Sequence, residues 1–317
     1  MPKDAKFLLN YGSVGYFMYV SLRAVMEAFR NRGGDERAIC RKFKKSFGYT
    51  PDLRRPKTMN EKIQWLKLYD RRDVKTVCAD KYAVRQWLVD TFGDEANKHL
   101  IPLLYVTSDW HDITLDNLPD EPFIIKPNHG SHQYKIVRDK SKLDIGILRN
   151  YCRMWLATDH YKYGQEWQYR DIPRKLVVEK LLADKEGHIP NDYKLHYING
   201  KLEFVYCSVG RETINKRNIY DAGWKPLHFS WSAKKRGTTP TRGPEVPPPP
   251  SFDDMKRYGE RIAQMFDYVR CDFYDVDGQM YFGEITFHHG GGYDHFAPEK
   301  YDLEYGQRLQ LTQRDSH

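Results

Sequence analysis

The sequence has few cysteines and no uninterrupted apolar stretch of membrane-spanning length. Its 5 cysteines are dispersed, odd in number and without CxxC spacing, so we expect small buried thiols in a reducing cytoplasm and no zinc site. A spanning helix needs about 20 mainly apolar residues, whereas glycines, Arg23 and Glu27 interrupt the apolar segment 7–29. This segment also lacks a convincing signal-peptide cleavage pattern.

Signatures of nucleic-acid binding are missing as well, because the chain has no recognition-helix, zinc-finger or RNP-type motif. The 51 Lys and Arg residues outnumber the 43 Asp and Glu residues, which leaves a net charge of +8. Such a surface favours anionic partners. We therefore expect a nucleotide, an acidic glycan or an anionic lipid as partner, and no nucleic acid.

The length and composition are those of a folded globular protein. With 317 residues, 37.6 kDa and 14% aromatic residues, the chain can form one large domain or two modest ones. Residues 1–75 are predicted to be mainly helical, and Thr58 with Glu61 forms a capping-box pattern before an apolar run. The segment 7–29 could lie on the inner membrane, but packing on its own domain or on a partner subunit, as in a homodimer, is favoured.

A β-hairpin is predicted near the end of the chain. Two alternating stretches, 269–276 and 279–287, flank Asp277-Gly278, which favours a two-residue type I′ turn. Alternation places Arg270 with Asp272 on one face of the first strand, and Glu284 with Thr286 on one face of the second. If the strands pair in simple register about the turn, these four side chains converge.

This cluster suits a metal-bound polyphosphate. Magnesium prefers hard oxygen ligands and usually takes one or two carboxylates, which Asp272 and Glu284 would supply. The Arg270 guanidinium could stabilise a phosphoryl group during transfer. The alternative is an amphipathic hairpin whose charged face simply meets water.

Two further stretches carry polar residues in suggestive places. The predicted strand 123–126 ends in Lys126 and leads into a small polar loop, whose backbone amides could fold over phosphates. The apolar run 176–182 carries Glu179 and Lys180, and a buried charge requires a partner. That partner is either an adenine amino group or a structural ion pair.

A second hairpin is predicted around Asn199-Gly200, with strands over 192–197 and 201–208. Its first strand presents one polar face, formed by Asp192, Lys194 and His196. The following segment 211–250 interleaves basic and aromatic residues, so it could pair acidic groups and stack on sugar rings. Arg211 is the strongest single candidate there, although a solvated basic loop would look the same.

The order of these motifs resembles that of ATP-grasp enzymes. More narrowly, residues 56–70 (PKTMNEKIQWLKLYD) and 282–287 (FGEITF) resemble the TupA-like ATP-grasp family of polysaccharide gene clusters, and the resemblance covers roughly residues 35–301. It implies an α/β (α+β) ATP-grasp fold, with ATP held between two subdomains that contain antiparallel sheets. The expected divisions are a helical region 1–75, a subdomain 76–178 with the phosphate loop, and a subdomain 179–317 with the metal site and the acceptor loop.

The resemblance also assigns roles to individual residues. Lys81 and Lys126 would contact the ATP phosphates, and the loop 128–133 would close over them. The residues expected to bind ATP are Lys81, Lys126, His129, Gly130, Ser131, Glu179, Lys180, Leu182, Asp192 and Lys194. The expected magnesium ligands are Asp272, Glu284 and Thr286, and the expected catalytic residues are Arg270 and Arg211. Two positions depart from the ATP-grasp pattern, since His132 replaces a common glycine and Thr286 a usual asparagine.

ATP-grasp enzymes typically activate a carboxylate as an acyl phosphate, which an amine then attacks. The resemblance therefore predicts an ATP- and Mg2+-dependent ligase in the cytoplasm. It would join a uronic-acid carboxylate of a capsular or O-antigen polysaccharide, or its precursor, to an amino acid or small amine. The alternatives are a glycosyltransferase, for which no DxD motif lies in a convincing loop, and an ATP-binding scaffold without turnover.

Overall fold

The structure is a computed structural model that describes residues 12–30, 33–210, 216–233 and 242–312. The chain forms two compact units. The first contains residues 1–38, 76–94 and 101–181, and the second contains residues 39–75, 95–100 and 182–317. Each unit is built around its own sheet and its own apolar core.

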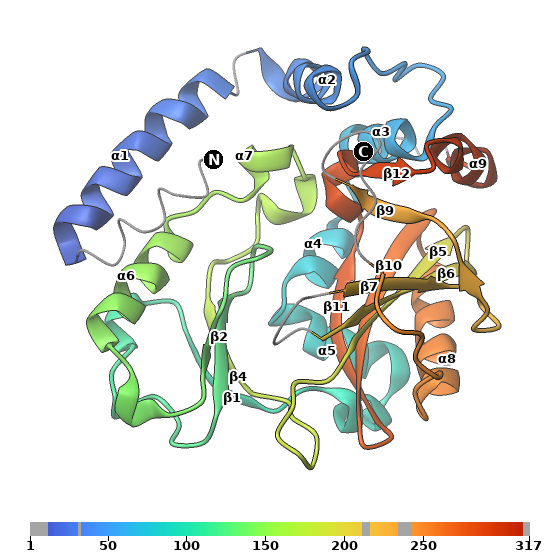
Figure 1. Cartoon of the computed structure of the whole chain (residues 1–317). Helices are drawn as coiled ribbons and strands as arrows, with labels where there is room; N and C mark the ends of the chain where they lie inside the picture. Colours follow the sequence, from blue (N-terminus) through green and yellow to red (C-terminus); the bar gives the residue numbers. More distant parts are fainter. Residues whose placement is uncertain (1–11, 31–32, 211–215, 234–241, 313–317) are drawn as a thin grey trace. The chain divides into compact units, whose positions relative to one another are not determined.

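The first unit contains a four-stranded antiparallel sheet in the order β1-β4-β2-β3. Its strands are β1 (Leu103–Thr107), β2 (Phe123–Pro127), β3 (Lys135–Val137) and β4 (Leu176–Lys180). The helices are α1 (Gly12–Arg30), α5 (Ala83–Phe92), α6 (Ile145–Leu156) and α7 (Tyr161–Gly164). Trp155 of α6 joins β2 residues Phe123 and Ile125 in one buried cluster, so α6 closes one side of the sheet (Figure 1).

The amino-terminal helix α1 packs against α6, which lies beside part of it in Figure 1. Tyr16 and Tyr19 are buried in the core of the unit, whereas Phe17 and Leu22 are exposed. The favoured interpretation, a helix packed on its own domain, therefore agrees with the structure. Within the described residues, no helix is both long and apolar enough to cross a membrane.

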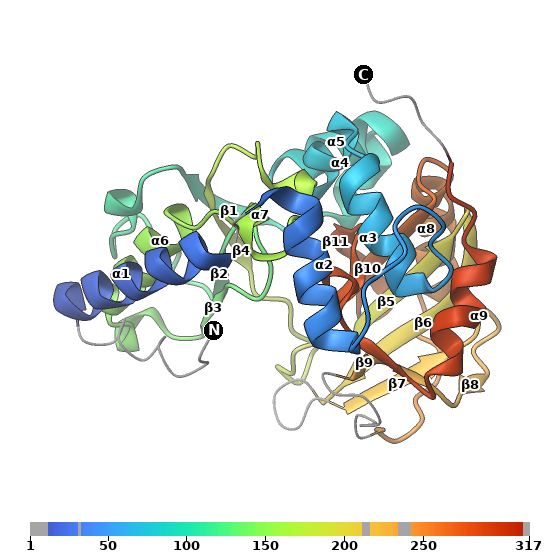
Figure 2. The same ribbon diagram turned by 90° about the horizontal axis from the view of Figure 1, so that it is seen from above.

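The second unit contains a six-stranded antiparallel sheet in the order β11-β10-β5-β6-β7-β8 and a two-stranded sheet of β12 and β9. The strands are β5 (Asp192–Ile198), β6 (Lys201–Val209), β7 (Lys216–Tyr220), β8 (Pro226–Leu227), β9 (Ser230–Ala233), β10 (Tyr268–Val276), β11 (Gln279–Thr286) and β12 (His295–Ala297). Helix α8 (Phe252–Ala263) packs on one face of the large sheet, against β5, β6 and β10 (Figure 2). The opposite face carries the polar side chains of Arg270, Asp272 and Lys194 beside apolar ones such as Phe204 and Ile219, which belong to the buried cluster of the second unit.

Both predicted hairpins are confirmed. Asp277 and Gly278 join β10 to β11 with φ values of 52° and 88°, and Asn199 and Gly200 join β5 to β6 with φ values of 46° and 80°. Positive φ at both central residues is the requirement of a type I′ turn, which Asn-Gly and Asp-Gly meet readily.

The helical region 1–75 is divided between the units, which differs from the expected ranges. Helices α2 (Gly34–Phe47) and α4 (Asp73–Ala79) each cross a boundary between the units, and α3 (Met59–Tyr69) lies wholly in the second unit. The predicted capping box starts α3, because the Thr58 side chain accepts from the Glu61 N–H and Glu61 accepts from the Thr58 N–H. The apolar face of α3 then packs against α9 (Lys300–Arg308), which explains why this segment belongs to the second unit.

Replacing Gly306 of α9 should destabilise the protein. A helix interior favours alanine over glycine by about 1 kcal/mol. However, a Cβ at Gly306 would lie 2.2 Å from the Lys57 carbonyl oxygen and 2.6 Å from the Met59 nitrogen, and both are backbone atoms. We expect Gly306→Ala to lower the free energy of unfolding by about 1–3 kcal/mol in chemical denaturation. In α6, Gly146→Ala meets only the Asp144 side chain at 3.3 Å and should be neutral or stabilising. Equal stability of both variants would contradict the proposed close packing.

Candidate active site

A β-bulge at Gly283 brings the predicted metal residues together. From the turn outward, Val276 pairs with Gln279 and Phe273 with Phe282, but the next pair is Asp272 with Glu284. Gly283 is the extra residue, and a Cβ there would lie 3.0 Å from the Asp272 carbonyl oxygen. Bulges of this kind re-aim the side chains that follow them.

The simple register expected from the sequence is therefore wrong, although the predicted convergence is correct. Without the bulge, Asp272 would pair with Gly283, and Glu284 would point to the opposite face. The sequence contained the signal, because buried apolar residues occupy even positions before the glycine and odd positions after it. These residues are Met280 and Phe282, then Ile285 and Phe287.

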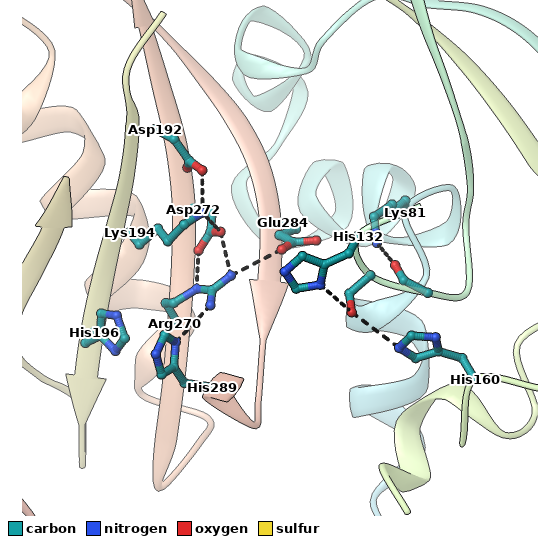
Figure 3. A network of polar contacts seen from close by, with 12 residues as sticks. Lys81, His132, His160, Asp192, Lys194, His196, Arg270, Asp272, Glu284 and His289 are labelled. Atoms are coloured by element: carbon teal, nitrogen blue, oxygen red, sulfur yellow. Dashed lines mark hydrogen bonds and ion pairs between the residues drawn. The ribbon is translucent and has the colours of Figure 1, made fainter. Parts of the chain in front are cut away.

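Arg270 lies at the centre of the polar face and is held by three side chains (Figure 3). Its Nε and Nη2 donate to the two oxygens of Asp272 at 2.6 and 2.7 Å, and Nη2 also donates to Glu284 Oε1 at 3.2 Å. Nη1 donates to His289 Nδ1 at 3.0 Å. Burial disfavours the charged guanidinium, but the adjoining Asp272 carboxylate outweighs it and raises the pKa of Arg270.

Strand β5 adds a second cation and a third carboxylate to the same face. Lys194 Nζ lies 2.7 Å from Asp272 Oδ2 and also contacts the Asp192 carboxylate. Burial lowers the pKa of Lys194, but Asp192 and Asp272 together raise it above its ordinary value. With Arg270 and Lys194 charged, the three carboxylates leave one excess negative charge, which favours a further cation.

The buried His289 supports Arg270, and a second buried histidine, His196, lies against His289; neither was predicted to take part. His289 Nε2 donates to the Trp231 carbonyl oxygen at 2.7 Å, so Nδ1 carries the lone pair that receives Arg270. Burial and then Arg270 keep the pKa of His289 well below its ordinary value. The His196 and His289 rings lie 5.0 Å apart in an edge arrangement. The pair His288-His289 before three glycines was the available signal, but it did not indicate which ring would face the arginine.

The donor set on this face fits magnesium. Asp272 and Glu284 are paired neighbours on β10 and β11 and offer hard oxygens, as magnesium requires. Asp272 is buried, whereas the Glu284 side chain is 32% exposed and so can meet a ligand from solvent. Thr286 pairs with Arg270 on the same face. Two protein carboxylates are enough, since magnesium takes its other ligands from water and phosphates.

A different cluster has three potential ligands close together, namely Asp184, Glu186 and His188. It is the one such group among the described residues, and it lies on a mostly exposed turn. The Asp184 carboxylate accepts from the backbone N–H groups of Glu186 and His188, which accounts for its position. We assign no metal to it.

In the first unit, the predicted phosphate loop begins at a firmly held asparagine. Asn128 Nδ2 donates to Asp80 Oδ1 at 2.8 Å and to the Pro173 carbonyl oxygen at 2.9 Å, and Asn128 Oδ1 accepts from the Lys175 N–H at 2.8 Å. Lys81 Nζ donates to the Gly130 carbonyl oxygen at 2.6 Å (Figure 3). The predicted residue Lys81 thus lies beside the loop.

The remaining loop residues differ in what they can offer a ligand. The His129 side chain is buried and its Nε2 contacts the carbonyl oxygens of Trp155 and Thr158, so any contact with a phosphate must come from its backbone. Ser131 Oγ lies 3.3 Å from His160 Nε2. His132 has a φ of 58°, the left-handed conformation that favours glycine, which explains why glycine is common at this position.

The predicted adenine residue Glu179 forms an ion pair, which was one of the two alternatives. Its Oε2 lies 2.5 Å from Lys126 Nζ, and its Oε1 lies 3.7 Å from Arg85 Nη1. Lys126 and Glu179 come from the adjacent strands β2 and β4, so the pair is held by the sheet. A charged pair at this point offers both a cation for a phosphate and an acceptor for an amino group.

The other predicted residues are less informative. The Lys180 side chain is exposed and lies 3.0 Å from Glu121, and Leu182 is half-buried just after β4. Arg211, the predicted second catalytic residue, falls outside the described residues.

Comparisons with known proteins give one family match. The sequence model of the TupA-like ATP-grasp family matches residues 61–310. No curated protein is significantly similar to the chain in sequence.

Several solved structures share partial similarity with the chain. The D-alanine–D-alanine ligase of Bacillus anthracis, solved with ATP, is 17% identical with a TM-score of 0.38, covering 67% of this chain and 54% of its own. The ATP-grasp ligase PsnB with a minimal precursor is 14% identical with a TM-score of 0.37, and the match covers 68% of this chain and 54% of PsnB. The Helicobacter pylori D-alanine–D-alanine ligase is 15% identical with a TM-score of 0.41, and the match covers 80% of this chain and 69% of the ligase. The chain spans about half the length of the first two proteins.

Substitution of Gly283 should disturb the bulge. A Cβ at this position meets the Asp272 carbonyl oxygen at 3.0 Å and Tyr274 Cε2 at 3.1 Å, so the strands must move apart. We expect Gly283→Ala to lower the free energy of unfolding by about 1–3 kcal/mol in a denaturant titration. The matched control is Gly223→Ala, where the nearest atom is an Asp221 side-chain oxygen at 3.4 Å. If both variants are equally stable, the close approach is not a constraint.

The buried His129 should make stability depend on pH. Burial, followed by the nearby Arg174 charge, lowers the pKa of His129 from 6.5 to about 4. The unfolded chain therefore binds more protons than the folded chain between pH 6.5 and pH 4. The free energy of unfolding is unaffected by His129 above pH 6.5 and falls as the pH drops through that window. The largest loss is about 3 kcal/mol.

We expect His129→Gln to flatten the pH dependence of the unfolding free energy over this window, as measured by denaturation at several pH values. Thr158→Ser is the control, because it changes a buried residue that contacts His129 and does not titrate, so the slope should stay that of wild type. A slope that is the same in wild type and His129→Gln would show that His129 titrates normally.

Proposed function

Because the chain belongs to the TupA-like ATP-grasp family, we propose that it is an ATP-dependent ligase that joins a carboxylate to an amine through an acyl phosphate. The family match confirms the resemblance in the motifs and the expected ATP-grasp fold class. The observation that carries the proposed reaction is the cluster on β5, β10 and β11, where one arginine and one lysine are held among three carboxylates.

In this proposal the second unit handles the phosphoryl group. Asp272 and Glu284 would hold magnesium, with Thr286 beside them, and the ion would neutralise charge on the terminal phosphates of ATP. The Arg270 guanidinium is already held in place before a phosphoryl group binds, because Asp272 and His289 fix all three of its nitrogens. Such preorganised cations stabilise charge that develops during phosphoryl transfer.

The first unit would bind the rest of the nucleotide. Lys81 and Lys126 would contact phosphates, and the backbone of residues 128–133 would cover them. Glu179 would accept from the adenine amino group, and the backbone that follows it, with Lys180 and Leu182, would also contact adenine. The ion pair between Lys126 and Glu179 supports this assignment, because it holds both groups extended on adjacent strands before a ligand binds.

The proposed reaction has two steps. A substrate carboxylate oxygen attacks the γ-phosphorus, the bond to the bridging oxygen breaks, and ADP leaves. The amine nitrogen then attacks the acyl carbon, a tetrahedral oxyanion forms, and phosphate departs as the amine loses its proton. Arg270 and Lys194 would hold the negative charge of the phosphoryl oxygens and then of the oxyanion.

We further propose a uronic-acid carboxylate of a polysaccharide or its precursor as the acceptor, with an amino acid or small amine as the nucleophile. This assignment rests on the resemblance of residues 56–70 and 282–287 to a family of polysaccharide gene clusters, and the net charge of +8 is compatible with it. Arg211 remains a candidate for contact with the acceptor.

The proposal is tested by measuring ADP release with a panel of uronates and amines. Asp272→Asn and Glu284→Gln should each lower turnover about a hundredfold or more, since each removes a charge from the phosphoryl site. Asp253→Asn is the control, because this carboxylate is 93% exposed on α8. Turnover that survives both site substitutions would refute the metal assignment. Release of UDP from a nucleotide sugar, without ADP, would indicate a glycosyltransferase instead.

A further inference from the structure

A small pocket lies on the second unit, on the same face of the large sheet as the cluster around Arg270. Its volume is about 90 Å3, and its lining includes Tyr206, Arg217, Ile219, His228, Ser230 and Arg242. A single water molecule needs roughly 10–15 Å3 of such space. The pocket therefore has room for a group of several heavy atoms, such as a carboxylate.

One buried polar atom in this pocket has no partner within the described residues. Ser230 is 7% exposed, and its Oγ makes no hydrogen bond there. Its neighbour Tyr206 is satisfied, because the hydroxyl donates to Ser232 Oγ at 2.7 Å and accepts from Arg217 Nη1 at 3.4 Å. Buried hydroxyls are normally paired, so Ser230 indicates a position that a ligand completes.

The remaining polar groups of the pocket are donors. Arg217 forms no ion pair with any acidic side chain in the described part of the chain, and its one hydrogen bond there is to the Tyr206 hydroxyl. Arg242 donates to His228 Nδ1 at 2.7 Å, so the ring proton of a neutral His228 is on Nε2, which is also a donor. Arg242 Nη2 also lies 4.0 Å from the Glu245 carboxylate. Arg217, the imidazole N–H and the serine hydroxyl together suit an oxygen anion, which can accept from all three.

The sheet fixes the separation between this pocket and the metal residues. One row of paired residues crosses the large sheet from β11 to β7. It consists of Glu284, Asp272, Lys194, Tyr206 and Ile219. Paired residues share a face, so all five point the same way, and Arg217, two positions from Ile219, does so too. Strand spacings of about 4.8 Å place the two pocket residues of this row, Tyr206 and Ile219, about 10 and 14 Å from Asp272.

We propose that this pocket binds a carboxylate of the acceptor other than the one that reacts. The separation is too large for one carboxylate to reach both places, so the acceptor carries at least two acid groups, as an acidic oligosaccharide does. The identity of the acceptor rests on the proposed function, whereas the binding of a carboxylate by the pocket does not.

The pocket is tested without ATP by titrating the protein with acetate, inorganic phosphate and acetamide, followed by isotope-edited NMR of the arginine side chains. We expect a saturable shift of the Arg217 signal with acetate and none with acetamide, because acetamide has the same shape without the charge. A response to phosphate but not to acetate would overturn the carboxylate assignment, and no saturable response to either would overturn the pocket.

Variants separate binding from folding. Arg217→Ala should weaken acetate binding about tenfold or more, because a charge-assisted hydrogen bond is lost. Ser230→Ala should also weaken it while leaving thermal stability unreduced, since its hydroxyl has no partner to lose in the described structure. Arg257→Ala is the matched control, because this arginine is 62% exposed on α8. Equal acetate affinity in all three variants would refute the site.

A kinetic measurement connects the pocket to the reaction. With any acceptor that supports ADP release, Arg217→Ala should raise the KM for that acceptor about tenfold, with kcat and the KM for ATP nearly unchanged. An unchanged acceptor KM would refute its role in acceptor binding. If no acceptor supports ADP release, the proposed function fails, but the acetate titration still decides whether the pocket binds a carboxylate.

Discussion

The pairing of Asp272 with Glu284 across the bulge at Gly283 determines which side chains share the polar face of the large sheet. Arg270 is held by both carboxylates, and Lys194 and Asp192 join through the next strand. The apolar residues enforce this pairing, because the alternative register would expose Ile285 and Phe287 and turn Glu284 to the apolar face of β11. The arrangement of the site and the packing of the core are thus one constraint.

Much of this arrangement was predictable from local sequence. Asp277-Gly278 and Asn199-Gly200 identified both hairpins, and the Thr58–Glu61 pattern identified the start of α3, because these motifs depend on a few adjacent residues. The shared face of Arg270 and Asp272 followed from alternation alone. The family resemblance then placed these elements in an ATP-grasp fold, which the family match confirms.

The remaining features depend on contacts between distant residues, which alternation and turn motifs do not describe. Simple alternation does not describe the bulge, because the buried apolar residues change from even to odd positions at Gly283. The orientation of His289 depends on the Trp231 carbonyl oxygen, 58 residues away in sequence. Ser230 on β9 and Arg217 on β7 belong to different sheets and line one pocket only in the folded chain. The division of residues 1–75 likewise depends on the packing of α3 with α9.

The path of the chain through the two units has a consequence for its dissection. Each unit is assembled from three separate pieces of sequence, and the chain passes from one unit to the other after residues 38, 75, 94, 100 and 181. A fragment that ends at residue 181 contains all three pieces of the first unit, together with the two earlier pieces of the second. The second core draws Met59, Ile63 and Leu66 from the early piece 39–75. A half-molecule that begins near residue 179 would lack these residues, so the second unit cannot be studied in a carboxy-terminal half alone.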